Sequence, residues 1–466
     1  MKRSLLSTLC LAALTCAAQS TDPSTGSEQA TLASSYNDFA FDFFQRIESE
    51  HVDENLILSP LSAQFALSML QNGAAGHTLA EIQQALHTTG YTLDDVNLYN
   101  RALINQLQVE PQIADWEREV YADIGKDPRD NYARVEIANG IWVCNDLPVY
   151  PSFFETNANY YDASAEAVDF GAPETYARLD QWAYDHTHGL IPSFGLEPSG
   201  CRAMVLANAL YFEGPWSSHF YDGYTRKRPF TNADGTTVDV DMMWCLSSGE
   251  LFAQTDNFEM QRRYYGADER FCMNLYLPKH DDAVLTVDEW RTLNTSTQIC
   301  DVDIHMPRFA IEDHLDLVDI LEGMGIHDAF SSTEADFSAI SPAALHVSKV
   351  YQKARIEVDE AGTAAAALTV IDSDSTGMPD PDKVPPLVTL NFDRPFYFTI
   401  EDCIDHSVLF MGHITNMTQL MSKMEADGID TVLAAPSTHR TYDLQGRPAA
   451  EGQHGISISD GRKTIR

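Results

Sequence analysis

The chain has 466 residues, 44% of them hydrophobic and 21% charged, which suffices for one large domain with appendages or for two or three ordinary domains. Its 30 Lys and Arg residues stand against 69 Asp and Glu residues, which gives a formal net charge of −39 at pH 7. A surface this acidic repels nucleic acid and anionic lipid, so neither is expected as a partner.

The N-terminus has the features of an export signal. Two basic residues precede an apolar run from Leu5 to Leu14, and small residues follow it. We predict a signal peptide over residues 1–18 and a linker over residues 19–33, with lipid attachment at Cys16 as the less favoured alternative. Both outcomes place the protein outside the cell, secreted or at the cell surface.

Signals for several other classes of protein are missing from the sequence. After the export signal no stretch reaches the ~18 consecutive apolar residues of a membrane-spanning helix, so no transmembrane segment is predicted. The cysteines are scattered, and no histidine has a ligand-like spacing to another strong ligand, so no metal or other cofactor is predicted. Because the GxSxG, HExxH, P-loop and GxGxxG motifs are also absent, we predict that the protein is not an enzyme. We expect a monomer.

Helical spacing dominates the first part of the chain. Residues 34–50 carry apolar side chains at helical intervals, and Ser59 followed by Pro60 supplies an N-cap and a first-turn proline for a second helix. Helical patterns continue to about residue 115. An acidic, irregular segment is predicted from there to about residue 134.

Strand-like patterns take over in the second part. They begin at Val135 and recur over residues 203–212, 272–277 and 302–311, and in several segments of residues 346–414. Because most helices precede most strands, with no βαβ alternation, we predict an α+β fold built on large antiparallel sheets.

The most informative segment is VDEAGTAAAALT, at residues 358–369. If this segment is extended, the face that runs from Thr363 to Ile371 carries only small or apolar side chains. No proline occurs before Pro379, so every backbone N–H in the run could join a β-ladder. The segment is therefore either a flexible Ala-rich connector or a strand that can enter a sheet.

Four other segments help to decide between these two interpretations. They read NLILSPLSAQFALSMLQNGAAGHTLAEIQQAL at residues 55–86, LANALYFEGPW at 206–216, EADFSAISPAALHVSKV at 334–350, and DRPFYF and VLFMGHITN within 393–416. In this order and at about this spacing, they resemble the serpin family. The resemblance covers residues 34–416 and implies a bundle of helices, three antiparallel β-sheets and an exposed reactive-centre loop at about residues 360–390.

The resemblance also implies a mechanism. Serpins offer the loop as bait to a protease. Cleavage lets the loop insert into a sheet as an extra central strand, which drags along the covalently attached enzyme and distorts its active site. The residues that match the family's hinge are Glu360, Gly362, Thr363, Ala364, Ala365, Ala366 and Ala367.

Two further groups of residues match sites where the family's sheet opens. At the breach, the upper end of the sheet, Glu360 is expected to pair with Arg308 near Trp216. At the shutter, where the strands part lower down, the matching residues are Ser59, Ser62, Asn208 and Gln352. Gln352 stands where the family commonly has histidine, and an amide can maintain the hydrogen bonds without titrating.

The scissile bond is less closely defined. Counting from the hinge gives Thr376-Gly377, and the length of the loop leaves Ser375, Met378 and Lys383 as alternatives. The small residues in this window favour an elastase-like serine protease or a papain-like cysteine protease. A trypsin-like target would need Lys383.

Fifty residues follow the region that resembles serpins. We predict a linker over residues 417–440 and a tail over residues 441–466, in which TYDLQGR and GISISDGRKTIR resemble the C-terminal sorting signal of Bacteroidetes type IX secretion cargo. Ser457 replaces the aromatic residue usual in such tails, so a terminal extension without this role is the alternative.

For the whole chain, the resemblance implies an irreversible suicide-substrate inhibitor of serine and papain-like cysteine endopeptidases, which forms a covalent complex with its target. The alternative is a non-inhibitory serpin that acts as a binding or carrier protein. The small residues of the hinge favour the inhibitor.

Overall fold

The computed structural model describes residues 23–363, 385–427, 456–459 and 462–465, except for residues 124, 197, 200, 201 and 222. The chain forms two compact units that meet at Asn416 and Met417. Several predicted features lie outside the described residues. They are the signal peptide (1–18) with Cys16, the hinge residues Ala364, Ala365, Ala366 and Ala367, and the candidate scissile residues Ser375, Thr376, Gly377, Met378 and Lys383.

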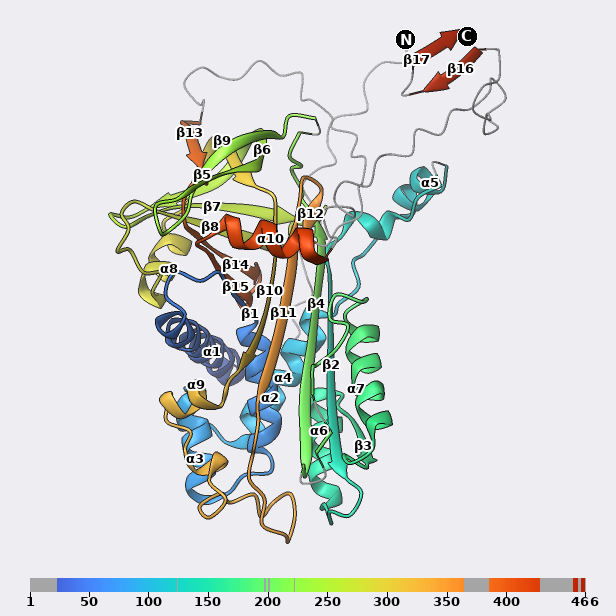
Figure 1. Cartoon of the computed structure of the whole chain (residues 1–466), viewed down its shortest axis with the longest axis vertical. Coiled ribbons are helices and arrows are strands. Elements are labelled where there is room, and N and C mark those ends of the chain that lie inside the picture. The colour runs from blue at the N-terminus through green and yellow to red at the C-terminus, as the bar shows by residue number, and fades with distance from the viewer. Residues whose placement is uncertain are drawn as a thin grey trace, which may run out of the picture. The chain divides into compact units, whose positions relative to one another are not determined.

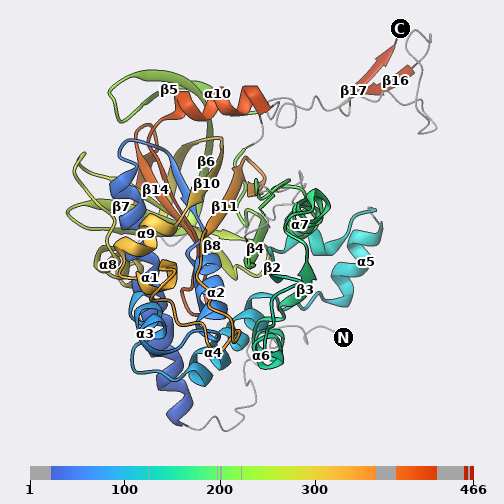
Figure 2. The same ribbon diagram turned by 60° about the horizontal axis from the view of Figure 1, so that its bottom comes forward.

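Helices occur along most of the first unit. They are α1 (Pro23–Glu50), α2 (Pro60–Gln71), α3 (Gly76–Ala85), α4 (Leu93–Leu107), α5 (Asp115–Asp123), α6 (Pro151–Tyr161), α7 (Pro173–His186), α8 (Val287–Thr295) and α9 (Val318–Gly323), with short 3-10 turns η1 (Pro128–Asn131) and η2 (Asp328–Phe330). Helices α1 to α4 lie together in Figures 1 and 2. The predicted apolar side of α1 is buried, with Phe39, Phe43 and Ile47 fully enclosed.

The acidic segment after residue 115 was predicted to be irregular, and this prediction is wrong for α5. Asp115 and Glu117 lie in the first turn of the helix, where negative charge is favoured by the helix dipole. The Glu117 carboxylate also accepts a hydrogen bond from the Ala114 N–H at 2.9 Å, which satisfies a free donor at the helix N-terminus.

A six-stranded sheet has the order β10-β11-β12-β4-β2-β3. Its strands are β10 (Phe309–Asp316), β11 (Tyr351–Val358), β12 (Gly362–Thr363), β4 (Met204–Pro215), β2 (Arg134–Cys144) and β3 (Ser164–Val168). All neighbours are antiparallel except β2 and β3, which are parallel. The helix between them, α6, makes this one βαβ unit that the sequence pattern did not indicate.

A nine-stranded sheet contains the other strands of the first unit. Its path is β1 (Leu56–Leu58), β15 (Val408–Ile414), β14 (Phe396–Asp402), β8 (Phe271–Pro278), β7 (Phe258–Tyr265), β6 (Thr237–Gln254), β9 (Gln298–Pro307) and β13 (Leu387–Asn391), with β5 (Arg226–Thr231) paired to β6. The long strand β6 pairs with β5, β7 and β9, and its register with β9 shifts between Ser247 and Glu250. Because β6 pairs with β5, β7 and β9, it joins these strands into one sheet. The resemblance implied three sheets, so strands expected in separate sheets belong to a single sheet here.

The second unit begins with α10 (Met417–Asp427), within the stretch predicted to be a linker. The predicted tail contains a hairpin of β16 (Ile456–Ser459) and β17 (Arg462–Ile465).

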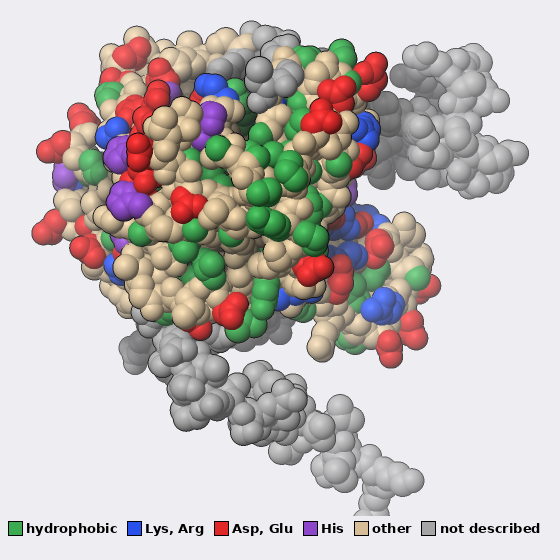
Figure 3. Space-filling model, turned by 90° about the horizontal axis from the view of Figure 1, so that it is seen from below, with side chains coloured by type: hydrophobic (Ala, Val, Ile, Leu, Met, Phe, Trp, Pro, Cys, Tyr) green, Lys and Arg blue, Asp and Glu red, His purple; other side chains and the backbone are tan. Residues whose placement is uncertain are grey.

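The surface reflects the composition. Figure 3 shows acidic side chains spread over one face of the molecule, few basic ones, and hydrophobic side chains gathered toward its middle. Within the described ranges, none of the helices has both the length and the hydrophobicity that a membrane crossing requires.

Helix α2 starts where the sequence predicted, because Ser59 is its N-cap. Ser59 has an extended backbone, and its hydroxyl accepts a hydrogen bond from the Ser62 N–H at 3.2 Å. The same hydroxyl donates to the Leu409 carbonyl of β15 at 2.7 Å. The serine therefore fixes the beginning of α2 to the nine-stranded sheet.

Replacing Ser59 with alanine removes both bonds. We expect Ser59→Ala to lower the free energy of unfolding by about 1–2 kcal/mol in urea denaturation. Ser62→Ala is the matched control, because the Ser62 hydroxyl has no hydrogen-bond partner among the described residues. Equal losses in the two variants would contradict the role of the cap.

Candidate functional site

The six-stranded sheet is incomplete in its middle. Strand β12 is only two residues long, and it alone joins β11 to β4: Thr363 pairs with Val358 on one side and with Gly214 on the other. Along the rest of their described lengths, no ladder of backbone hydrogen bonds links β11 to β4. In Figure 1 the two long strands run side by side with β12 between their upper ends. Two facing strand edges in the interior of the sheet thus lack ladder partners.

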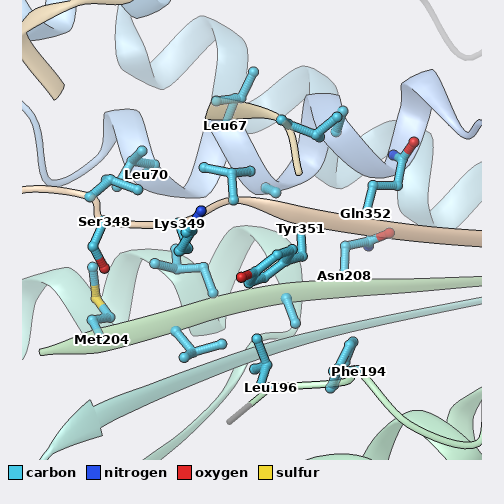
Figure 4. A pocket seen from close by; sticks show the side chains of 18 of the residues that line it. Leu67, Leu70, Phe194, Leu196, Met204, Asn208, Ser348, Lys349, Tyr351 and Gln352 are labelled. Carbon is cyan, nitrogen blue, oxygen red and sulfur yellow. The ribbon is translucent and has the colours of Figure 1, made fainter. Parts of the chain in front are cut away.

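A cavity of about 120 Å³ lies below β12, between β4, α2 and residues 345–353. Leu67 and Leu70 of α2 and Met204 of β4 line it, so its wall is largely apolar. Figure 4 shows Asn208 and Gln352, both predicted for the shutter, close to this space on opposite strands.

The predicted shutter residues form two separate groups. The Gln352 amide donates to the Ser59 carbonyl at 2.7 Å and accepts from the Ser59 N–H at 3.3 Å. Ser62 belongs to the same group through its N–H bond to Ser59. The Gln352 side chain thus uses both its donor and its acceptor on the backbone of Ser59.

Asn208 forms the other group, on the β4 side. Its amide donates to Asn139 Oδ1 at 3.0 Å and to the Ala138 carbonyl at 3.4 Å, both in β2. Its Oδ1 is buried and has no hydrogen-bond partner among the described residues. The predicted shutter residues are therefore divided between the two sides of the gap between β11 and β4, and one acceptor there lacks a hydrogen-bond partner among the described residues.

The end of β11 turns sharply into β12. The Asp359 N–H donates to the Gly362 carbonyl at 3.0 Å. The Asp359 carboxylate accepts from the N–H groups of Ala361 and Gly362, at 2.8 and 3.1 Å. This side-chain turn directs the chain back into the sheet at Gly362.

Trp216 holds this turn from the side of β4. Its backbone N–H donates to the Ala361 carbonyl at 2.8 Å, and its indole N–H donates to the Asp359 carbonyl at 2.9 Å. The indole ring is 1% exposed and stacks on Tyr265, with the ring centroids 4.4 Å apart. The structure therefore brings the predicted breach tryptophan against the base of the loop.

Glu360 meets the predicted cation. Its carboxylate lies 2.6 Å from Arg308 Nη2 and accepts a second hydrogen bond from the Thr225 hydroxyl. Burial raises the pKa of Glu360, but the bonds from Arg308 and Thr225 outweigh burial, so its pKa lies below the usual value. Burial also raises the pKa of the neighbouring Asp359. There it outweighs the hydrogen bonds from Ala361 and Gly362, so the pKa lies above the usual value.

Thr363 is completely buried at the top of the gap. Its hydroxyl is hydrogen-bonded to the Tyr265 hydroxyl at 2.5 Å, and its backbone pairs with Gly214. A Cβ on Gly214 would lie 3.0 Å from a carbon of the Tyr265 ring, so glycine permits this close packing. Only a small side chain fits at position 363.

Sequence reasoning missed Tyr265 and Thr225. Tyr265 ends β7, a strand that was not predicted, although two tyrosines followed by Gly266 are typical of a strand that ends in a turn. Thr225 lies just before β5 and offers no local signal of its contact with Glu360.

One cluster has a spacing that suits metal ligands and that sequence reasoning overlooked. His77 and Glu81 lie one turn apart on α3, and Asp328 of η2 completes a group within 4.8 Å. His77 Nδ1 bonds the Asp328 carboxylate at 2.7 Å, and this hydrogen bond raises the pKa of His77. His77 lies between the two carboxylates, and Glu81 also accepts hydrogen bonds from the N–H groups of His327 and Asp328. The cysteines among the described residues are free thiols.

The ion pair of Glu360 predicts a pH dependence. A depressed carboxyl pKa contributes stability above the unfolded value of about 4.3, and this contribution is lost as the pH falls through the folded pKa. Asp359, whose pKa is raised by burial and also by the neighbouring Glu360 charge, acts in the opposite sense, and a Glu360→Gln variant loses the part that comes from this charge.

We therefore expect Glu360→Gln to reduce stability at pH 7 by about 1.5–3 kcal/mol, with the deficit shrinking below about pH 4. Thermal unfolding of both proteins between pH 3 and 7 measures this difference. Glu155→Gln, at an exposed position of α6, serves as the control. A deficit in stability that stays constant down to pH 3 would show that the ionised carboxylate of Glu360 is not its source.

Comparison with known proteins agrees with this architecture. The family model described as serpin (serine protease inhibitor) matches residues 34–417. Serpin B11 of Homo sapiens is 28% identical over 408 residues, which cover 83% of this chain and 99% of the relative. Plasminogen activator inhibitor 1 of Neovison vison is 29% identical over 403 residues, covering 81% and 91%.

A solved structure extends the agreement to three dimensions. The thermophilic serpin tengpin, in its native state, matches with a TM-score of 0.70 at 27% identity, covering 83% of this chain and 94% of that one. The fold, the family match over most of the sequence and the loop that enters a sheet at Gly362 all agree, and the chain belongs to the serpin family.

Proposed function

We propose that this serpin is an irreversible, suicide-substrate inhibitor of endopeptidases and that it acts outside the cell. A protease cleaves the loop at residues 360–390 and becomes attached to it as an acyl-enzyme. The loop then inserts between β11 and β4 from the end held by Gly362 and Thr363. The covalent complex traps the protease.

One observation carries this proposal: in the part of the chain that the structure describes, β11 and β4 are joined only by the two residues of β12. A strand that continued from Thr363 would lie antiparallel to both neighbours and would supply partners for their free edges. The cavity below β12 lies on the path of such a strand. The small residues that follow Thr363 in the sequence suit this path.

The energy available supports trapping. A strand that filled the gap would add on the order of ten ladder hydrogen bonds, each worth about 1 kcal/mol net. This sum is comparable to the ~5–15 kcal/mol stability of an ordinary domain. Insertion could therefore distort a protease that is still attached to the loop.

The target follows from the sequence of the loop. Thr376-Gly377 is the proposed scissile bond, with Ser375, Met378 and Lys383 as alternatives, and an elastase-like serine protease or a papain-like cysteine protease is the proposed class of target. The masses of the fragments released by each protease identify the bond. Plasminogen activator inhibitor 1, one of the relatives, is named as an inhibitor.

Incubation with both classes of protease tests the function. We expect a complex that survives a denaturing gel, together with nicked protein whose melting temperature is about 10 °C higher, because each kcal/mol shifts Tm by about 1 °C in a domain of this size. A protease lacking its nucleophile is the control and should give no complex. Cleavage without complex and without added thermal stability would indicate a binding or carrier protein instead.

Position 363 tests the insertion step. Thr363→Arg places a charge in a fully enclosed site, so cleavage should continue while trapping falls by about tenfold or more. Thr363→Ser keeps the hydroxyl and the small volume, and it should trap like the wild type. The ratio of inhibitor consumed to protease inhibited measures both. Undiminished trapping by Thr363→Arg would falsify the assignment of the hinge.

A further inference from the structure

Two buried arginines adjoin one another on β7 and point to opposite faces. Arg262 is 6% exposed and Arg263 is 1% exposed. Arg262 donates from Nε to Asn274 Oδ1 at 3.0 Å and from Nη2 to Asn294 Oδ1. Arg263 instead faces the segment that follows β4. Strand alternation thus places one cation at the breach and the other away from it.

Arg263 has no carboxylate partner among the described residues. Its Nη2 donates to the Ser218 carbonyl, and its Nη1 donates to Cys245 Sγ at 3.5 Å. The guanidinium lies 4.4 Å from the ring centroid of Phe220 and 5.3 Å from that of Trp216. A buried charge is therefore stabilised by two aromatic faces and a backbone carbonyl, an arrangement suited to the planar guanidinium.

The segment that Arg263 contacts holds the base of the loop. Both N–H groups of Trp216 bind the turn before β12, and the Phe220 N–H donates to the Glu360 carbonyl at 3.2 Å. Trp216 also stacks on Tyr265, the partner of Thr363. Arg263 thus contacts Trp216 and Phe220, and these two residues bind the turn from which the inserting strand starts.

We infer that Arg263 is a positioning residue that determines how fast the cleaved loop inserts. The inference rests on the proposed function. Insertion must extend from Gly362 and Thr363, whose partner strand ends at Pro215, directly before Trp216. If this segment loosens, the strand starts more slowly. Hydrolysis of the acyl-enzyme is then completed before insertion in a larger fraction of encounters, and the protease is released.

Arg263→Met tests this inference, with Arg262→Met as the matched control on the same strand. Arg263→Met removes the cation–π contacts with Trp216 and Phe220, so we expect this variant to consume at least about fivefold more inhibitor per protease trapped. Arg262→Met should lower the melting temperature but leave this ratio within about twofold of the wild type. Arg263→Lys keeps the charge, should recover part of the trapping, and carries the test if the methionine variant does not fold.

A second readout separates this inference from the proposed function. After the loop is nicked, the time course of tryptophan fluorescence reports the rate of insertion without a trapped enzyme, and the rise in melting temperature reports that insertion has occurred. Equal rates in the wild type and Arg263→Met overturn the role of Arg263 while leaving the function intact. A slower variant in a protein that traps no protease supports Arg263 and overturns the proposed function. A wild type that neither traps nor changes after nicking overturns both.

Discussion

Backbone groups in the middle of a sheet require hydrogen-bond partners, and between β11 and β4 the described residues leave most of them without a ladder. Among the described residues, the two of β12 are the one place where the ladder is complete across the gap. The other features of the site lie around this gap. They are the turn at Asp359, the stacked rings of Trp216 and Tyr265, and, lower down, the side-chain amides of Gln352 and Asn208 on its two sides. On the proposed function, the same incompleteness supplies the energy that traps a protease.

The two ends of the gap differ in chemistry. The breach combines an ion pair, a raised carboxyl pKa and packed aromatic rings, so its strength depends on pH and on aromatic packing. The shutter contains hydroxyls and amides, none of which titrates near neutral pH. Acid should therefore act on the upper end of the gap first. The presence of Gln352, where the family commonly has histidine, removes a titrating group from the shutter.

Much of the fold could be predicted because its signals are local. The start of α2 followed from Ser59 and Pro60, β2 followed from the change in pattern near Val135, and the α+β serpin fold is confirmed by the family and structural matches. Helix α5, strands β5 to β7 and the parallel pairs β2/β3 and β9/β13 were not predicted. A period of two or 3.6 residues indicates the buried face of an element but does not indicate which element lies beside it.

For the site, the resemblance to serpins indicated which residues to expect there: a small side chain at position 363, an acid at 360, a cation at 308 and an amide at 352. The structure brings Glu360 and Arg308 together and joins Gln352 to Ser59. The folded chain was needed to place Asn208 across a gap from the other shutter residues, and Tyr265, Thr225 and Arg263 at the breach. These contacts join strands far apart in the chain, and their geometry depends on packing and register, which no local pattern specifies.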